Sequence, residues 1–84
     1  MDMNELLGDE ILEIVNNQLR SNNPPQTKQT LERLMKEGYS KTDAKKLIGQ
    51  CVVAEVTRVV MERKPFDEER FVKNLDRLPE EPVM

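Results

Sequence analysis

The hydrophobic positions of this chain recur at three- and four-residue intervals in four segments, the spacing of amphipathic helices. One segment carries an unusual surplus of apolar residues. Placed at about 100° per residue, they spread over roughly 240° of the helix circumference, whereas a surface helix usually buries a stripe of about 100° or somewhat more. They are Ala44, Leu47, Ile48, Cys51, Val52, Val53, Val56, Val59 and Val60. We therefore expect neighbouring helices, from the same chain or from a partner chain, to wrap this helix.

Capping signals place this long helix over residues 41–64. Ser40 and Asp43 have the spacing of a capping box, in which side chains satisfy N–H groups that the first helical turn leaves unpaired. Pro65 ends the run, because proline lacks an amide hydrogen and clashes with the preceding turn. The valines also suit a β-strand, but an alternating pattern would leave polar or charged residues on both faces. The spacing therefore favours a helix.

Three shorter helices are predicted over residues 3–22, 24–37 and 68–78, each with apolar side chains on one face. We therefore predict an all-α, four-helix domain over residues 1–79. The long third helix lies at its centre, and the other three pack around it. Residues 80–84 are predicted to form a frayed tail.

Local capping chemistry supports the second helix. Asn23 suits the N-cap, and Pro24 suits the first helical position, where a missing N–H costs nothing. Gly38 can take the left-handed conformation that ends a helix. Tyr39 can then fold back onto Leu34, which predicts a Schellman motif.

The fourth helix has signals at both ends. Asp67 suits the N-cap, and the flanking Phe66 and Phe71 have the spacing of a hydrophobic staple. Leu78 precedes Pro79, and a residue before proline avoids the helical region. The helix is therefore expected to end there.

Glu55 interrupts the apolar arc of the third helix, one turn after Cys51 and one turn before Val59. A carboxylate at such a position is costly unless it is paired or reaches water. We expect the first helix to supply a polar partner, of which Gln18 and Asn22 are the candidates, or a seam between helices to expose the group. The alternative is a polar floor for a small ligand cleft, where burial would raise the pKa of Glu55.

The surplus apolar surface predicts an interface. Five residues of the first and third helices exceed what three short helices can cover, and contiguous exposed apolar patches usually mark interaction sites. They are Leu6, Leu12, Val53, Val56 and Val60. A symmetric homodimer is the simplest occupant. The alternative is a monomer in which the first and fourth helices cover these side chains.

Little in the composition points to catalysis. The chain has no histidine, one cysteine and three glycines that are isolated in sequence, so it lacks the usual general base, a cysteine metal site and a glycine-rich phosphate loop. Cys51 lies on the apolar arc and is predicted to behave as an inert hydrophobe. We expect no enzyme activity, no bound cofactor and no metal.

Charge offers one alternative function. Lys41, Lys45 and Lys46 give the third helix a basic start, and residues 31–47 have the outline of a helix-turn-helix. The net charge of −3 argues against a dedicated nucleic-acid binder. We predict a non-catalytic protein-interaction module that is able to self-associate. The alternative is a nucleic-acid-associated regulator that uses this lysine edge.

The cellular location follows from three features. No apolar run approaches the roughly 20 residues that a membrane span needs. The acidic start lacks the basic residues and apolar core of a signal peptide, and a single cysteine allows no internal disulfide. We therefore expect a cytoplasmic protein that does not associate with membranes.

The region from Asn23 to Pro79 also resembles a family of small, uncharacterised, all-helical bacterial proteins. The matching positions are Asn23-Pro24-Pro25, Thr30-Leu31-Glu32-Arg33-Leu34, Gly38, Ala44, Ile48-Gly49, Glu55, Phe66-Asp67 and Leu75 to Pro79. The resemblance implies an all-α fold and no particular activity. Members of this family carry histidines about where Thr42 and Lys46 stand, so a metal-linked role is not implied for this chain.

Overall fold

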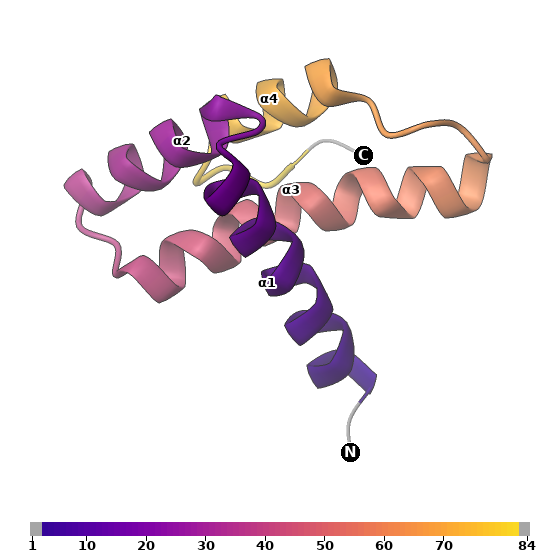
Figure 1. The fold of residues 1–84 in the computed structure, drawn as a ribbon, viewed down its shortest axis with the longest axis horizontal. Coiled ribbons are helices and arrows are strands. Elements are labelled where there is room, and N and C mark those ends of the chain that lie inside the picture. The colour runs from indigo at the N-terminus through magenta and orange to yellow at the C-terminus, as the bar shows by residue number, and fades with distance from the viewer. Residues whose placement is uncertain (1–2, 83–84) are drawn as a thin grey trace.

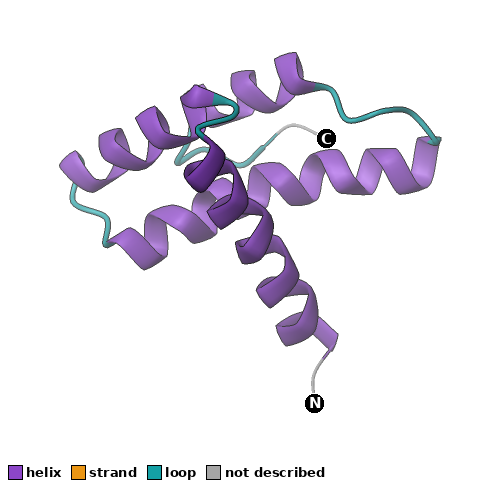
Figure 2. Cartoon of the chain, viewed as in Figure 1, coloured by secondary structure: helices purple, strands orange, loops and turns teal. Residues whose placement is uncertain are grey.

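The computed structural model describes residues 3–82, with side chains from residue 8 onward, and forms four α-helices in that span. They are α1 (Met3–Ser21), α2 (Pro25–Lys36), α3 (Lys41–Glu62) and α4 (Glu68–Arg77). The described residues contain no strand, and loops join the helices (Figure 2). The predicted all-α, four-helix fold is confirmed, with every boundary within two residues of its predicted place.

α3 is the central helix of the fold and packs against each of the other three (Figure 1). α2 and α4 lie along the same side of α3 and contact each other. α1 crosses α3 steeply, and its N-terminal half continues past α3, away from α2 and α4 (Figure 1). Among the described residues, this half of α1 therefore meets another helix only near the crossing.

The ends of α3 follow from local chemistry. The Ser40 Oγ accepts a hydrogen bond from the backbone N–H of Asp43 at 3.0 Å, as the capping-box spacing predicts. Arg63 takes a left-handed conformation with φ of 56°, which ends the helix two residues before the predicted boundary. Lys64 could not have extended it, because the residue before Pro65 is pushed out of the helical region.

The start of α2 differs by one residue from the prediction. Pro24, rather than Asn23, is the N-cap, and Pro25 occupies the first helical position. The reason is the second proline: Pro24 precedes Pro25 and is therefore forced into an extended conformation, with ψ of 150°. The Pro24 carbonyl still accepts the first helical hydrogen bond, from the Thr27 N–H at 3.2 Å.

The Schellman motif at the end of α2 is confirmed. Gly38 has a positive φ of 109°, and its N–H donates to the Met35 carbonyl at 3.1 Å. The Tyr39 N–H donates to the Leu34 carbonyl at 3.1 Å, which completes the pair of bonds that defines the motif. The half-buried Tyr39 ring then packs against the core.

The predicted signals of α4 are also present. The Asp67 side chain accepts a hydrogen bond from the Arg70 N–H at 3.0 Å and so caps the helix. The rings of Phe66 and Phe71 meet with their centroids 5.4 Å apart, as the staple spacing predicts. Phe71 is fully buried, so this contact ties the entry of α4 to the core.

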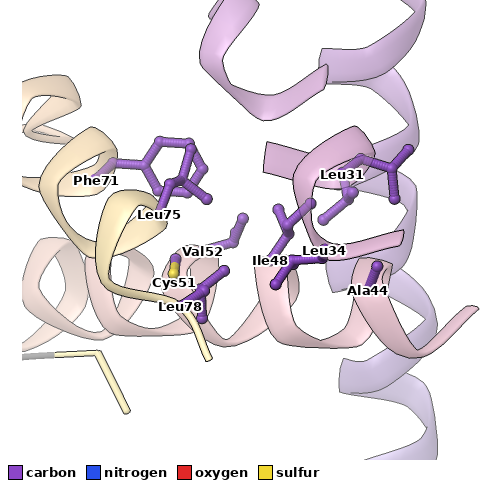
Figure 3. Close-up of a cluster of buried hydrophobic side chains, with 10 residues drawn as sticks. Leu31, Leu34, Ala44, Ile48, Cys51, Val52, Phe71, Leu75 and Leu78 are labelled. Carbon is purple, nitrogen blue, oxygen red and sulfur yellow. The ribbon is translucent and has the colours of Figure 1, made fainter. Parts of the chain in front are cut away.

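The core lies where α2 and α4 face α3, with Val15 joining it from α1. Figure 3 shows Phe71 and Leu75 of α4 above Val52 of α3, and Leu34 of α2 beside Ile48. Its fully or nearly fully buried members are Val15, Leu31, Leu34, Ala44, Ile48, Cys51, Val52, Phe71, Leu75 and Leu78. Burial of each large side chain in this set stabilises the folded state by about 1.5–3 kcal/mol. The cluster is therefore the main hydrophobic contribution to stability.

Arg33 of α2 forms hydrogen bonds to the C-terminal end of α4. Its guanidinium donates to the carbonyls of Leu75 and Leu78 at 3.0 and 3.1 Å, and it also pairs with Glu37 at 2.6 Å. Carbonyls at a helix C-terminus have no partner within the helix, and a positive charge complements the helix dipole there. This link fixes the last turn of α4 over α2.

Candidate functional site

The crossing of α1 and α3 creates an apolar groove. The helices approach closely at Gly49, where an added Cβ would lie 3.0 Å from the Cγ2 of Ile11. Beside this contact a groove of about 430 Å³ opens between the two helices. Its lining residues are Gly8, Ile11, Leu12, Lys46, Gly49, Gln50 and Val53. We call it the α1–α3 groove.

An exposed apolar stripe continues from this groove along α3. Val53 lies in the groove and is 43% exposed, and Val60, seven residues later on the same helix face, is 70% exposed. Val56 lies between them and is half-buried. The residues Val53, Val56 and Val60, called the valine stripe below, therefore present an apolar edge to solvent.

The predicted interface residues are partly brought together by this arrangement. Leu12 is half-buried and lines the α1–α3 groove together with Val53. Val56 and Val60 extend the surface beyond it. Leu6 lies outside the described side chains. In the single chain, therefore, no described residue covers the exposed side chains of the valine stripe. The other helices are expected to surround α3 along its length, but the last turns of α3 remain exposed.

The chain beyond α4 lies beside the same face of α3. After Pro79, the Glu80 N–H donates to the Arg77 carbonyl at 2.9 Å. Glu81 and Pro82 then line a groove of about 330 Å³ together with Gln50, Val53 and Ala54 of α3. Gln50 and Val53 thus line both grooves, which meet at these two residues.

Glu55 is fully buried and held by two groups near the start of α4. Its Oε2 accepts from the Nε of Arg70 at 2.6 Å, and its Oε1 accepts from Nη2 of the same guanidinium at 2.8 Å. Oε1 also accepts from the backbone N–H of Asp67 at 3.1 Å. The two parallel bonds form a bidentate pair, which is the strongest arrangement of arginine with carboxylate.

This pairing corrects two expectations about Glu55. Its partner comes from α4, not from α1: Gln18 instead accepts a hydrogen bond from the Thr27 hydroxyl at 2.9 Å, and Asn22 follows the end of α1 with a positive φ. The side-chain hydrogen bonds from Arg70 lower the pKa of Glu55 and outweigh burial, which raises it. The alternative of a ligand cleft with a raised pKa is therefore wrong.

Arg70 is the residue of this pair that sequence reasoning missed. It is three residues after the N-cap Asp67 and directly before Phe71, on the side of α4 that turns toward α3. A buried carboxylate on one helix calls for a cation on the facing helix, and Arg70 is the arginine nearest the buried face of α4. That signal becomes usable once α4 is known to face Glu55.

The predicted lysine edge is divided between two surfaces. Lys46 lines the α1–α3 groove. Lys41 and Lys45 instead line a separate groove of about 440 Å³ between the C-terminal half of α1, residues 28–31 of α2 and the start of α3. The three lysines therefore do not form one continuous edge.

Neither the buried thiol nor the acidic residues offer an assembled reactive site. Cys51 is fully buried, and burial raises the pKa of its thiol to about 12. Among the described side chains, no three metal-binding residues come together. Within the same span, no helix is long and apolar enough to cross a bilayer.

Comparison with known proteins returns no relative. No family model, curated protein or solved structure matches the chain. The resemblance of the region from Asn23 to Pro79 to a helical bacterial family therefore stays a prediction.

Proposed function

We propose that this chain is a cytoplasmic, non-catalytic interaction module that self-associates through the α1–α3 groove and the valine stripe. The observation that carries the proposal is the continuity of the two surfaces at Val53. An apolar groove joined to an exposed apolar edge is the kind of patch that marks protein contacts. Glu55 and Cys51, two groups with altered pKa values, are both enclosed in the core, which supports a non-catalytic role.

Charge complementarity favours a second copy of the chain as the occupant. The exposed residues Asp9 and Glu10 make α1 acidic near the groove, whereas Arg63 and Lys64 make the end of α3 basic. If α1 of one copy lies along the valine stripe of its partner, opposite charges meet at the rim. A two-fold arrangement makes this contact twice, and such symmetry is the commonest form of homo-oligomer.

Sedimentation equilibrium tests this proposal. The parent chain is expected to sediment above the 9.8 kDa of a monomer at high micromolar concentration and to approach twice that mass. Val60→Glu should return it to the monomer, because a charge buried in an apolar contact is costly. Val60 is largely exposed in the single chain, so this change leaves the fold intact.

Val59→Glu provides the matched control. Val59 is also a partly exposed valine of α3, but it lies about 120° around the helix from Val53 and about 100° from Val60, the two exposed residues of the stripe; the half-buried Val56 is nearer, at about 60°. This variant should associate like the parent. A parent chain that stays monomeric at high micromolar concentration would remove the proposal, and so would equal loss of association in both variants.

A further inference from the structure

A second groove gathers positive charge from three helices. It has a volume of about 440 Å³ and lies between the C-terminal half of α1, residues 28–31 of α2 and the start of α3. Its basic lining residues are Arg20, Lys28, Lys41 and Lys45. We call it the basic groove. It shares no lining residue with the α1–α3 groove, so an inference about it is independent of self-association.

Within the described part of the chain, three of these cations have no acidic partner. Among the described residues, no carboxylate lies within salt-bridge distance of Lys28, Lys41 or Lys45, and only Arg20 is paired, with Glu13 at 3.2 Å. Lys41 and Lys45 also stand in the first turns of α3, where the helix dipole disfavours cations; Asp43 is the one acidic residue of that first turn. The described residues thus place Lys28, Lys41 and Lys45 around one groove without a carboxylate that pairs with them.

The floor of the basic groove is apolar. Leu19 of α1 and Leu31 of α2 line it between the charged side chains, and no aromatic residue lines it. Single-stranded nucleic acids are usually held by aromatic stacking platforms in addition to basic residues. A net charge of −3 also repels an extended polyanion, whereas a short acidic segment meets only the local field.

We propose that the basic groove binds a segment of a partner protein in which acidic side chains flank an apolar one. The carboxylates would pair with the ammonium groups of Lys28, Lys41 and Lys45, and the apolar side chain would rest on Leu19 and Leu31. Charge complementarity sets the occupant: three lysines without an acidic partner among the described residues, beside an apolar floor, fit carboxylates that flank an apolar side chain. The lysines provide flexible point charges, which suit carboxylates at variable spacing.

An NMR titration tests this proposal with the full chain at low ionic strength. The probe is a synthetic pentapeptide, Glu-Glu-Leu-Glu-Glu, and the matched peptide replaces every glutamate with glutamine. We expect the acidic peptide to shift the amide signals of α1, α2 and α3 around the basic groove and to lose affinity as salt is added. The double variant Lys41→Gln with Lys45→Gln should bind about fivefold more weakly, which is the fold-change expected for two partly exposed ion pairs.

Controls separate this site from general attraction between opposite charges. The double variant Lys36→Gln with Lys73→Gln removes the same charge from exposed lysines that line neither the basic groove nor the α1–α3 groove, and it should bind like the parent. An oligothymidylate of equal charge should bind more weakly than the peptide. The proposal is overturned if the glutamine peptide binds equally well, if both double variants lose affinity alike, if the oligothymidylate binds more tightly, or if no signal moves.

Discussion

At the scale of single residues, Glu55 is tolerated in the core because three donors satisfy its carboxylate. The bidentate guanidinium of Arg70 and the N–H of Asp67 occupy both oxygens, so the charged form is stabilised despite burial. Helical periodicity alone predicts that Glu55 faces inward. Its partner could not be predicted in this way, because periodicity does not fix which helix faces it.

The variant Glu55→Gln tests this pair. The pKa of Glu55 is lower in the folded than in the unfolded chain, so its contribution to stability is present above the unfolded value of about 4.3 and is lost as pH falls through the folded value. We expect the variant to lose roughly 1–3 kcal/mol at pH 7, because a buried charged hydrogen bond is removed. The difference from the parent should shrink as the pH is lowered below about 4.

Denaturant unfolding over a range of pH measures this difference. Glu62→Gln is the matched control, since Glu62 is an exposed residue of the same helix that pairs with Arg58 at 3.1 Å. It should change stability by less than about 1 kcal/mol. A Glu55→Gln chain that unfolds like the parent at every pH would contradict the assigned ion pair.

The thiol of Cys51 gives a second test at the same scale. Burial raises its pKa to about 12, so almost no thiolate exists near neutral pH, and the sulfur is also out of reach of reagents. We expect an aromatic disulfide reagent at pH 8 to react at least on the order of a thousandfold more slowly with the folded chain than with the denatured chain. Reaction of the folded chain at the rate of a free thiol would show that the core around Cys51 is open.

At the scale of elements, caps and breakers fix where each helix lies along the chain. Ser40, Gly38 and Asp67 act locally, through bonds to backbone groups a few residues away, and so they could be predicted from the sequence. The crossing of α1 over α3 could not, because it depends on close contact between residues far apart in sequence. Gly49 and Ile11 make that contact.

Glycine-to-alanine substitutions compare a helical glycine with free space around it, Gly8, with the glycine at the crossing of α1 and α3, Gly49. Gly8→Ala in α1 meets no atom within 4 Å, so it should stabilise the chain by up to about 1 kcal/mol through helix propensity alone. Gly49→Ala gains the same propensity, but its Cβ would lie 3.0 Å from the Ile11 Cγ2, so the side chain or α1 must shift. We expect thermal unfolding to show a smaller gain, or a loss, for Gly49→Ala. Equal stabilisation by both changes would mean that α1 does not approach α3 at Gly49.

At the scale of the whole molecule, the steep crossing of α1 decides which surfaces remain open. α1 crosses α3 steeply (Figure 1) and approaches it closely at Gly49. The described residues leave Val53 and Val60 of the valine stripe exposed, and Gly8, Ile11 and Leu12 of α1 form one wall of the α1–α3 groove. The surplus of apolar residues on α3 predicts such a surface. Its position and its separation from the basic groove depend on how the helices are arranged in space.

An isotope-filtered NOE experiment on a mixture of labelled and unlabelled chains tests the proposed self-association most directly. At concentrations where the chain is dimeric, the methyl groups of Val53 and Val60 should show intermolecular contacts with α1 of the partner, including Leu12. The opposite charges at the rim predict further intermolecular contacts between Asp9 or Glu10 of α1 and Arg63 at the end of α3 of the partner. The account is contradicted if the valine methyls show no intermolecular contact, or if the contacts lie only at the basic groove.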